Sequence, residues 1–361
     1  MSVTLLARAP SNIALIKYMG KKDSAENLPE NSSLSFTLSS LCTYADVEPN
    51  QSSPGAPVQW ISEIPRVKSE RPLIVPTLDE KGVYRVTSHA QRVRALMPKV
   101  LPRFGVNCDL EAVSRLGLTL RTANTFPAAS GIASSASSFA AVTLGVAMAC
   151  AANFDEFERA YSNDLRLKRE LAKISRKGSG SSCRSFEGPW VQWQNEDIFA
   201  VDSDIPKLAH FVILISAESK EISSSRAHEL VRSSPLWSGR VVRAESKLLR
   251  MRSALMAGDV NTIAQLSWSE AWEMHSLFHT ASTPFTYWEP ETVAALKWLT
   301  PEILNIHPPI VTLDAGPNIH VLVDARDAGS WRQRLFEKFG MNRVLEDQPG
   351  GGASVIGVKP L

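Results

Sequence analysis

The sequence contains little cysteine and no long hydrophobic run. Its four cysteines, Cys42, Cys108, Cys150 and Cys183, show no CxxC spacing, and so few do not make a disulfide framework in a chain of 361 residues. No apolar run reaches the ~18 residues that a membrane-spanning helix requires. The first residues lack the basic, apolar and small-residue blocks of a signal peptide. We therefore expect a protein of the reducing cytoplasm with no role in a membrane.

The chain also lacks an excess of charge of either sign. Lysine and arginine number 39 and aspartate and glutamate 37, which gives a net charge of +2. A dedicated nucleic-acid-binding protein would carry a basic excess, so we expect no nucleic-acid partner, whereas a local basic pocket for a small anion stays allowed. With 44% hydrophobic and 21% charged residues the composition is that of a globular protein, and the length favours two domains.

The hydrophobic pattern predicts strands and helices in both halves. We expect strands over 3–18, 33–49 and 110–126, within 201–216, and over 308–313 and 319–325. We expect helices over 88–104, 138–152, 154–176, 226–257, 259–280, 290–300 and 327–340. A turn is expected near 20–23, and the proline-rich segment 50–80 is expected to be a loop or a broken hairpin at a sheet edge. The mixture predicts an α+β fold with domains over 1–205 and 206–361.

Two segments rich in glycine and serine are candidate anion-binding loops. In 127–142, small residues and serines lead into an apolar helix, whose N-terminus offers free N–H groups and partial positive charge to a phosphate. A serine-rich helix cap without a ligand has the same pattern. In 175–185, SRKGSGSSCRS combines glycines that expose backbone donors with arginines that bind anions. A solvated loop is the alternative here, but the position between a helix and a strand-like segment favours an anion site.

Two single charged residues add to the candidate chemistry. Lys17 would share a strand face with Ile13 and Leu15, and such a lysine either is functional or extends its ammonium group to water. Asp314 follows the apolar strand PPIVTL and precedes a Gly-Pro turn. It either satisfies local N–H groups in that turn or is a carboxylate at the mouth of a cleft, where it could orient or deprotonate a hydroxyl. The combination is compatible with phosphoryl transfer to a small acidic molecule.

A histidine pair raises the question of a metal site. His275 and His279 lie four residues apart, which places them on one helical face. No HExxH sequence and no third ligand accompany them. We therefore expect a buried cluster that lines a substrate cleft, and no zinc site.

Six sequence segments lie between residues 11 and 318. They are SNIALIKYMGKKD, LPENSSLSFTL, NTFPAASGIASSASSFAA, ISRKGSGSSCRS, FHTASTPFTYW and TLDAGPN. In this order they resemble the mevalonate diphosphate decarboxylase family, within the GHMP superfamily of small-molecule kinases. The pattern PxxxGxxSS alone would indicate only the superfamily, whereas KGSGSSCRS together with DAGPN is much more specific to the decarboxylases.

The resemblance implies a two-domain GHMP-kinase-like fold with the active site in the interdomain cleft. The N-terminal part would be similar to domain 2 of ribosomal protein S5, and the C-terminal part would be ferredoxin-like. The implied activity uses ATP and Mg²⁺ to phosphorylate the 3-hydroxyl of mevalonate 5-diphosphate, and loss of that phosphate and of CO₂ then yields isopentenyl diphosphate. This step belongs to the mevalonate pathway of isoprenoid biosynthesis, and a homodimer is implied.

The resemblance also implies roles for individual residues. Asp314 would orient or deprotonate the 3-hydroxyl, and Lys17 would hold Asp314 ionised. Arg184, helped by Asn12, would bind the substrate carboxylate. The other positions would hold the 5-diphosphate, namely Tyr18, Lys21, Ser179 and Ser181, and the ATP phosphates, namely Gly131, Ser134 and Ser135.

Several positions depart from the family pattern. Met19 stands where the family commonly has tryptophan, SSC replaces SAC in the second loop, and EGPWVQW replaces a glycine-rich strand start. A diphosphate-binding arginine is expected around 85–94, where Arg85, Arg92 and Arg94 remain open. The alternatives are a decarboxylase of the 5-monophosphate, a mevalonate 3-kinase-type enzyme that releases no CO₂, and a non-catalytic binding relative.

Overall fold

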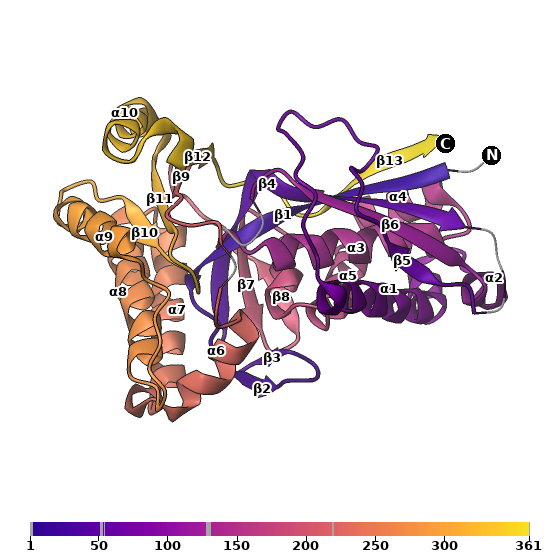
Figure 1. Cartoon of the computed structure of the whole chain (residues 1–361), viewed down its shortest axis with the longest axis horizontal. Coiled ribbons are helices and arrows are strands. Elements are labelled where there is room, and N and C mark those ends of the chain that lie inside the picture. The colour runs from indigo at the N-terminus through magenta and orange to yellow at the C-terminus, as the bar shows by residue number, and fades with distance from the viewer. Residues whose placement is uncertain (1–2, 51–52, 54, 128–130, 219, 361) are drawn as a thin grey trace.

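The computed structural model describes residues 3–50, 53, 55–127, 131–218 and 220–360. Within these residues it contains two large sheets, each covered by helices, and one small hairpin (Figure 1). The expected α+β architecture is confirmed. None of the helices in the described part of the chain combines the length and the apolar character needed to cross a membrane.

The first sheet lies mainly in the N-terminal half. Its order is β13-β1-β4-β6-β5, with β7 paired to β4 and β8 paired to β7. Its strands are β1 (Val3–Ile16), β4 (Ser33–Asn50), β5 (Val58–Trp60), β6 (Gly117–Asn124), β7 (Trp190–Gln194), β8 (Asp197–Ala200) and β13 (Ser354–Pro360). The long strands β1 and β4 run antiparallel, in a register that pairs Leu5 with Val47 and Asn12 with Thr37. The hairpin β2 (Lys21–Asp23) and β3 (Leu28–Pro29) follows directly after β1.

Helices of the N-terminal half cover one face of this sheet. They are α1 (Glu80–Val100), α2 (Leu110–Ser114), α3 (Ser134–Cys150), α4 (Phe154–Asn163) and α5 (Leu165–Arg176). The helix α3 is apolar on nearly every side because it lies between the sheet and α1, where Leu144 joins Val47 and Met97 in one core. Gly145 permits a close approach to β4, since a Cβ there would lie 2.7 Å from Cγ2 of Val47.

The second sheet has the order β10-β11-β9-β12. Its strands are β9 (Leu208–Ile213), β10 (Ile310–Thr312), β11 (Ile319–Asp324) and β12 (Val344–Asp347). The helices of this half are α6 (Ser224–Leu230), α7 (Arg240–Met256), α8 (Val260–His279), α9 (Pro290–Ile303) and α10 (Ala328–Phe339). The helices α7 and α8 run side by side, and α8 contacts β10 (Figure 1).

The two halves share a hydrophobic core. Ile13 of β1 and Phe36 of β4 are buried together with Met251 of α7 and Leu322 of β11. The far end of β1 therefore lies inside the second half, and the chain leaves β1 at the junction. We keep the boundary near residue 205 as a proposal; β9 begins after it, while β13 returns from the end of the chain to pair with β1.

Most predicted elements are confirmed, and the exceptions have local causes. The strand predicted over 110–126 is wrong in its first part, where Asp109 accepts from the N–H groups of Glu111 and Ala112 and starts α2. The helix predicted over 154–176 is two helices, because Asp164 ends α4 and caps α5. The helix predicted over 226–257 is likewise divided into α6 and α7.

Three further elements of the N-terminal half differ in smaller ways from the predictions. The helix predicted over 88–104 begins earlier, at Glu80, because Asp79 caps it through the Gly82 N–H. The segment 50–80 contains the short strand β5 at the edge of the sheet, as expected of a proline-rich edge. The turn predicted near 20–23 contains the short strand β2.

The C-terminal glycines offer a test of how the 3₁₀ helix η2 (Gly180–Ser185) is held. The N–H of Ala353 donates to the Ser185 carbonyl at 2.7 Å, and a Cβ on Gly352 would lie 2.2 Å from the Phe186 carbonyl oxygen, whereas one on Gly351 would meet nothing within 4 Å. We expect Gly352→Ala to lower the free energy of unfolding by about 1–3 kcal/mol through overpacking, measured by urea denaturation. Gly351→Ala is the matched control, and an equal effect of both substitutions would contradict this account.

Candidate active site

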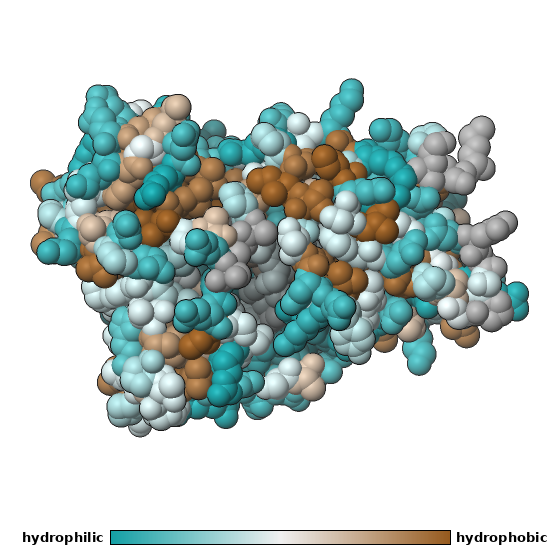
Figure 2. All heavy atoms as spheres, in the orientation of Figure 1, coloured by the Kyte–Doolittle hydropathy of each residue, from teal (hydrophilic) through white to brown (hydrophobic). Residues whose placement is uncertain are grey.

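A cavity of about 260 Å³ lies where the end of β1, the start of α3, η2 and the loop after β10 meet. On the face shown in Figure 2 the surface is hollowed between the two halves, with hydrophilic side chains on both sides of the hollow. Of the residues predicted from the sequence, the cavity lining includes Lys17, Tyr18, Lys21, Gly131, Ser135, Ser179, Ser181, Arg184 and Asp314. The fold therefore brings together residues from both halves of the chain.

An ion pair between Lys17 and Asp314 forms the floor of the cavity. Lys17 Nζ lies 2.6 Å from Asp314 Oδ1 and donates a second hydrogen bond to the Ala14 carbonyl at 2.6 Å. The lysine side chain is 2% exposed and the carboxylate 23% exposed, so Asp314 is the member of the pair that faces the cavity.

The pair sets the protonation of Asp314. Burial acts to raise the pKa of the Asp314 carboxyl, but the charges of Lys17, His320 and Arg184 outweigh it and hold the pKa below its usual value of 3.8. Burial lowers the pKa of Lys17, and Asp314 acts in the opposite direction. The carboxylate is therefore ionised at neutral pH. It does not serve merely as a turn-forming residue, because its side chain pairs with Lys17 across the junction.

Arg184 and Asn12 form a second buried unit. Arg184 Nε donates to Asn12 Oδ1 at 3.0 Å, and its Nη1 donates to Ser33 Oγ at 2.7 Å. The Asn12 amide in turn donates to Ser185 Oγ at 2.9 Å and to the Ser181 carbonyl at 3.1 Å. Arg184 lines the cavity, whereas Asn12 is not among the described lining residues. Asn12 therefore orients the guanidinium group from behind the cavity wall.

Tyr18 and Lys21 lie on the wall that η2 shares with the hairpin β2–β3. The Tyr18 hydroxyl is buried and has no hydrogen-bond partner among the described residues, although its ring contacts Trp193 at 4.7 Å between centroids. Lys21 Nζ donates to Asn27 Oδ1 at 2.7 Å, and burial lowers the pKa of Lys21. An unpaired buried hydroxyl in a cavity that is also lined by an ammonium group is suited to a polar ligand.

The start of α3 faces the same cavity. Its N-cap is Ala133 at φ 48°, and no described side chain caps it. The Ala136 N–H donates to the Ala133 carbonyl at 2.8 Å, so the donors that the described contacts leave for an anion are the N–H groups of Ser134 and Ser135. Among the described residues, no serine side chain forms the helix cap that was the alternative interpretation of this segment. Ser135 Oγ lies 3.3 Å from Ser179 Oγ, so the two predicted loops meet, whereas Ser134 is not among the described lining residues. Residues 128–130 of the first motif lie outside the described residues.

The structure also brings in residues that the sequence motifs missed. Among the three arginines left open, Arg85 lines the cavity, Arg92 is exposed, and Arg94 donates to the carbonyls of Ala56 and Leu116. Lys220 also lines the cavity and donates to the Ala315 carbonyl. No local motif marks Lys220, because it lies in the segment between β9 and α6, which only the fold brings close to Asp314.

Two histidines support the cavity in their neutral form. Burial beside Lys21 lowers the pKa of His228 to about 3, and its Nδ1 accepts from the Gly20 N–H at 3.0 Å. Burial lowers the pKa of His275 to about 3 as well, and its Nε2 donates to the Asp314 carbonyl at 3.2 Å. Across the described residues, no group of three or more His, Cys, Asp or Glu side chains could hold a metal ion.

The charge of the cavity is strongly unbalanced. Its described lining carries a single carboxylate, that of Asp314. Its basic side chains are Lys17, Lys21, Arg85, Arg184 and Lys220. A concave cationic surface of this kind concentrates the electrostatic field and attracts a polyanionic ligand, while the ionised carboxylate in its floor can accept a proton or a hydrogen bond.

Comparisons with known proteins bear on this arrangement. Residues 9–204 match the family model of the diphosphomevalonate decarboxylase-like N-terminal domain, and residues 210–353 match that of the mevalonate 5-diphosphate decarboxylase C-terminal domain. The diphosphomevalonate decarboxylase of Eremothecium gossypii is 31% identical, over 92% of this chain and 81% of the relative. That of Saccharomyces cerevisiae is 28% identical, over 93% of this chain and 82% of the relative.

Solved structures agree with the family matches. A mevalonate diphosphate decarboxylase from Legionella pneumophila superposes with a TM-score of 0.74 at 36% identity, over 95% of this chain and 100% of that chain. A structure described as MDDEF in complex with MVAPP, AMPPCP and magnesium superposes with a TM-score of 0.78 at 26% identity, over 99% of this chain and 100% of that chain. The resemblance and the two-domain fold predicted from the sequence are confirmed.

The charge balance of the floor is testable without turnover. We expect Lys17→Met to raise the pKa of Asp314, because the largest charge that opposes the effect of burial is then removed. Carbon-13 NMR titration of aspartate-labelled protein measures this pKa. Lys21→Met is the matched control, since Lys21 lines the same cavity but is paired with Asn27. Titration of Asp314 at an unchanged or lower pH in Lys17→Met would contradict the assignment.

Proposed function

This chain belongs to the mevalonate diphosphate decarboxylase family, and from that membership we propose that it catalyses the ATP-dependent decarboxylation of mevalonate 5-diphosphate to isopentenyl diphosphate. The observation that carries the proposal is an ionised Asp314, paired with buried Lys17, in the floor of a cationic cleft. The relatives named above are diphosphomevalonate decarboxylases, which does not favour a monophosphate decarboxylase or a 3-kinase-type enzyme.

The reaction explains why this site combines one base with many cations. A tertiary hydroxyl is a poor leaving group, and transfer of the ATP γ-phosphoryl group to its oxygen makes it a good one. The C3–O bond then breaks with its electron pair leaving on phosphate. The bond to the carboxylate carbon breaks as CO₂ departs, and its electrons form the new C=C bond. The enzyme must therefore position anions and neutralise charge rather than supply a covalent group.

Asp314 and Lys17 act on the 3-hydroxyl. The Asp314 carboxylate accepts or orients the hydroxyl proton as the oxygen attacks the γ-phosphorus. Lys17 keeps Asp314 ionised in the resting site and stabilises the negative charge that develops beside it. Because the pair is already formed before substrate binds, little reorganisation is needed during the transfer.

Other residues hold the substrate at its two ends. Arg184, oriented by Asn12, binds the carboxylate that leaves as CO₂. The 5-diphosphate lies against the opposite wall. There the proposed donors are Tyr18, Lys21, Arg85, Ser179 and Ser181. The unpaired hydroxyl of Tyr18 fits this role because a buried donor needs an acceptor.

The start of α3 fits the phosphates of ATP. Its uncapped N–H groups and the hydroxyl groups of Ser134 and Ser135 supply donors, and Gly131 at φ 72° lets the backbone come close to a ligand. Mg²⁺ is usually held by phosphates with only one or two carboxylates, so the single carboxylate Asp314 is compatible with it. When bound, Mg²⁺ neutralises charge on the phosphates.

The oligomeric state and the cellular location of the protein are further proposals. We propose that the enzyme is a homodimer, which light scattering on the purified protein tests. We propose that it works in the cytoplasm, where a reducing environment would keep its cysteines free, as all four are in the structure.

Asp314→Asn tests the proposed function directly. We expect the folded variant to lose about 10²–10⁴-fold in the rate of both ADP and CO₂ release, because the amide cannot accept the hydroxyl proton. The exposed Asp155→Asn on α4 is the matched control. A variant that keeps most of the wild-type rate would overturn the role of Asp314.

Arg85→Ala tests the diphosphate wall. We expect KM for mevalonate 5-diphosphate to rise about 10- to 100-fold, the cost of one charge-assisted hydrogen bond, with a smaller change in KM for ATP. Arg92→Ala, on the exposed side of the same helix, should leave both constants unchanged. Equal KM values in the two variants would show that Arg85 does not reach the diphosphate.

A further inference from the structure

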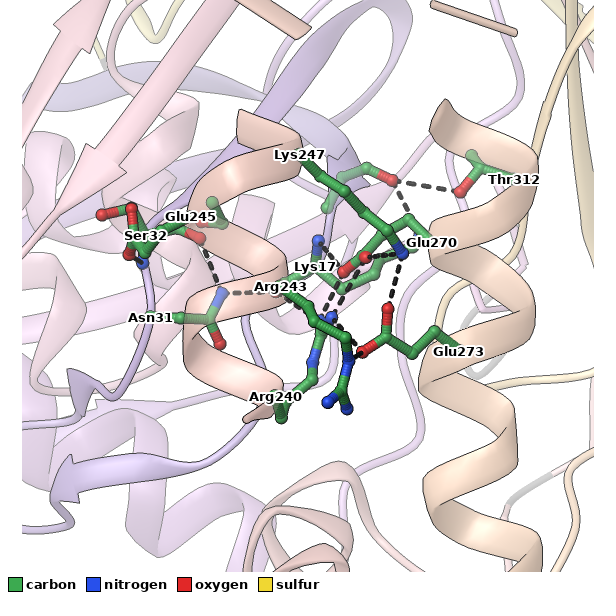
Figure 3. Close-up of polar contacts among 12 residues, drawn as sticks. Lys17, Asn31, Ser32, Arg240, Arg243, Glu245, Lys247, Glu270, Glu273 and Thr312 are labelled. Atoms are coloured by element: carbon green, nitrogen blue, oxygen red, sulfur yellow. Dashed lines mark hydrogen bonds and ion pairs between the residues drawn. The ribbon is translucent and has the colours of Figure 1, made fainter. Parts of the chain in front are cut away.

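A network of buried charges adjoins Lys17 (Figure 3), and none of its other charged residues is among the described lining residues of the cavity. Its centre is the ion pair of Arg240, at the first turn of α7, with Glu270 in the middle of α8, and both side chains are 0% exposed. Lys247 Nζ donates to the other carboxylate oxygen of Glu270 at 3.0 Å. Burying charged groups in this way is costly, so the position of the network deserves a functional explanation.

The network is joined to the backbone of Lys17. β1 ends at Ile16, and the Lys17 N–H donates to Glu270 Oε1 at 3.1 Å. The Lys17 carbonyl accepts from Arg240 Nη2 at 3.3 Å and from Asn31 Nδ2 at 2.9 Å. The backbone N–H and the carbonyl of Lys17 are therefore both held by the Arg240–Glu270 ion pair, and Asn31 adds a second donor to the carbonyl.

This attachment determines where the lysine side chain can reach. With the Lys17 backbone fixed, Nζ lies 2.6 Å from both the Ala14 carbonyl and Asp314 Oδ1. A displacement of the backbone by even about 1 Å would lengthen these contacts, and misplacement on that scale costs up to about 100-fold in rate. A long, flexible side chain needs such a support to keep one geometry.

We propose that Glu270 and Arg240 are positioning residues for Lys17, which hold its backbone from both sides so that its ammonium group meets Asp314. The proposal rests on the function proposed above, because it concerns the lysine of that site. A purely structural ion pair would stabilise the contact of α7 with α8 without any bond to Lys17.

Glu270 also acts on the charge of Lys17. The groups that act on this ammonium group are Asp314 after β10, Glu270 and His275 on α8, Arg184 on η2 and His320 on β11, whereas Arg240 on α7 contacts the backbone carbonyl of Lys17. Burial lowers the pKa of Lys17, whereas the negative charges of Asp314 and Glu270 act to raise it. Removing the charge of Glu270 while Arg240 stays would therefore make the lysine lose its proton at a lower pH.

The test compares Glu270→Gln with Glu273→Gln. Glu273 lies one turn further along α8 and pairs with Arg240, Arg243 and Lys247, but none of the described contacts joins it to Lys17. For Glu270→Gln we expect kcat to fall about 10- to 100-fold with little change in either KM. The alkaline limb of its kcat–pH profile should move about one pH unit lower. Glu273→Gln should match the wild type in both measurements.

A second measurement needs no turnover. NMR of lysine-labelled protein, with the Lys17 signal assigned through Lys17→Arg, should show Lys17 titrating about one pH unit lower in Glu270→Gln and unchanged in Glu273→Gln. If the wild type released no ADP, the proposed function would fail, yet this titration would still test the contact of Glu270 with Lys17 on which the positioning role rests. If Glu270→Gln does not fold, the paired apolar replacement Arg240→Met with Glu270→Leu takes its place in the kcat measurement, since buried ion pairs are often exchanged in this way without loss of the fold.

Two results would overturn the positioning role of Glu270 and Arg240. A folded variant with a lower Tm but wild-type kcat, pH profile and Lys17 titration would mean that the ion pair only stabilises the contact between α7 and α8. A fall in kcat of similar size in Glu273→Gln would equally overturn the proposal, because the effect would then come from the network as a whole.

Discussion

The ion pair of Lys17 with Asp314 is the interaction on which the rest of the site depends. Lys17 follows β1 in the N-terminal half and Asp314 follows β10 in the C-terminal half, so the pair closes the junction of the two sheets. The Ala14 carbonyl reinforces it by accepting from Lys17 Nζ and from Thr312 Oγ1 at 3.2 Å. A charge removed from water costs several kcal/mol unless it is paired, so neither residue could occupy this place alone.

The surroundings of the pair explain the chemistry of the cleft. Asp314 remains ionised despite burial because cations surround it, and the same cations leave the cavity open to a ligand with several negative charges. The uncapped start of α3 adds backbone donors at the other side. Fixed charges and dipoles of this kind favour a reaction that moves phosphate and carboxylate groups, in which positioning and charge neutralisation supply most of the catalysis.

Sequence patterns predicted the long and strongly apolar elements, and the motifs predicted the residues that act locally. β1, β4 and α3 are confirmed because their apolar patterns are long, whereas the strand predicted at α2 is wrong because the Asp109 cap starts a helix there. Lys17 and Asp314 were identified from separate motifs. Arg85 was one of three choices, and Lys220, Glu270 and Arg240 carried no motif, because only the fold brings them to a site built from distant segments.

The most direct measurement is a coupled assay of the purified protein with ATP and Mg²⁺, in which ADP and CO₂ are followed together. Mevalonate, its 5-phosphate and its 5-diphosphate would each be offered separately. The account predicts equal amounts of ADP and CO₂ with the 5-diphosphate alone. ADP without CO₂, or turnover of another of the three substrates in preference, would contradict it.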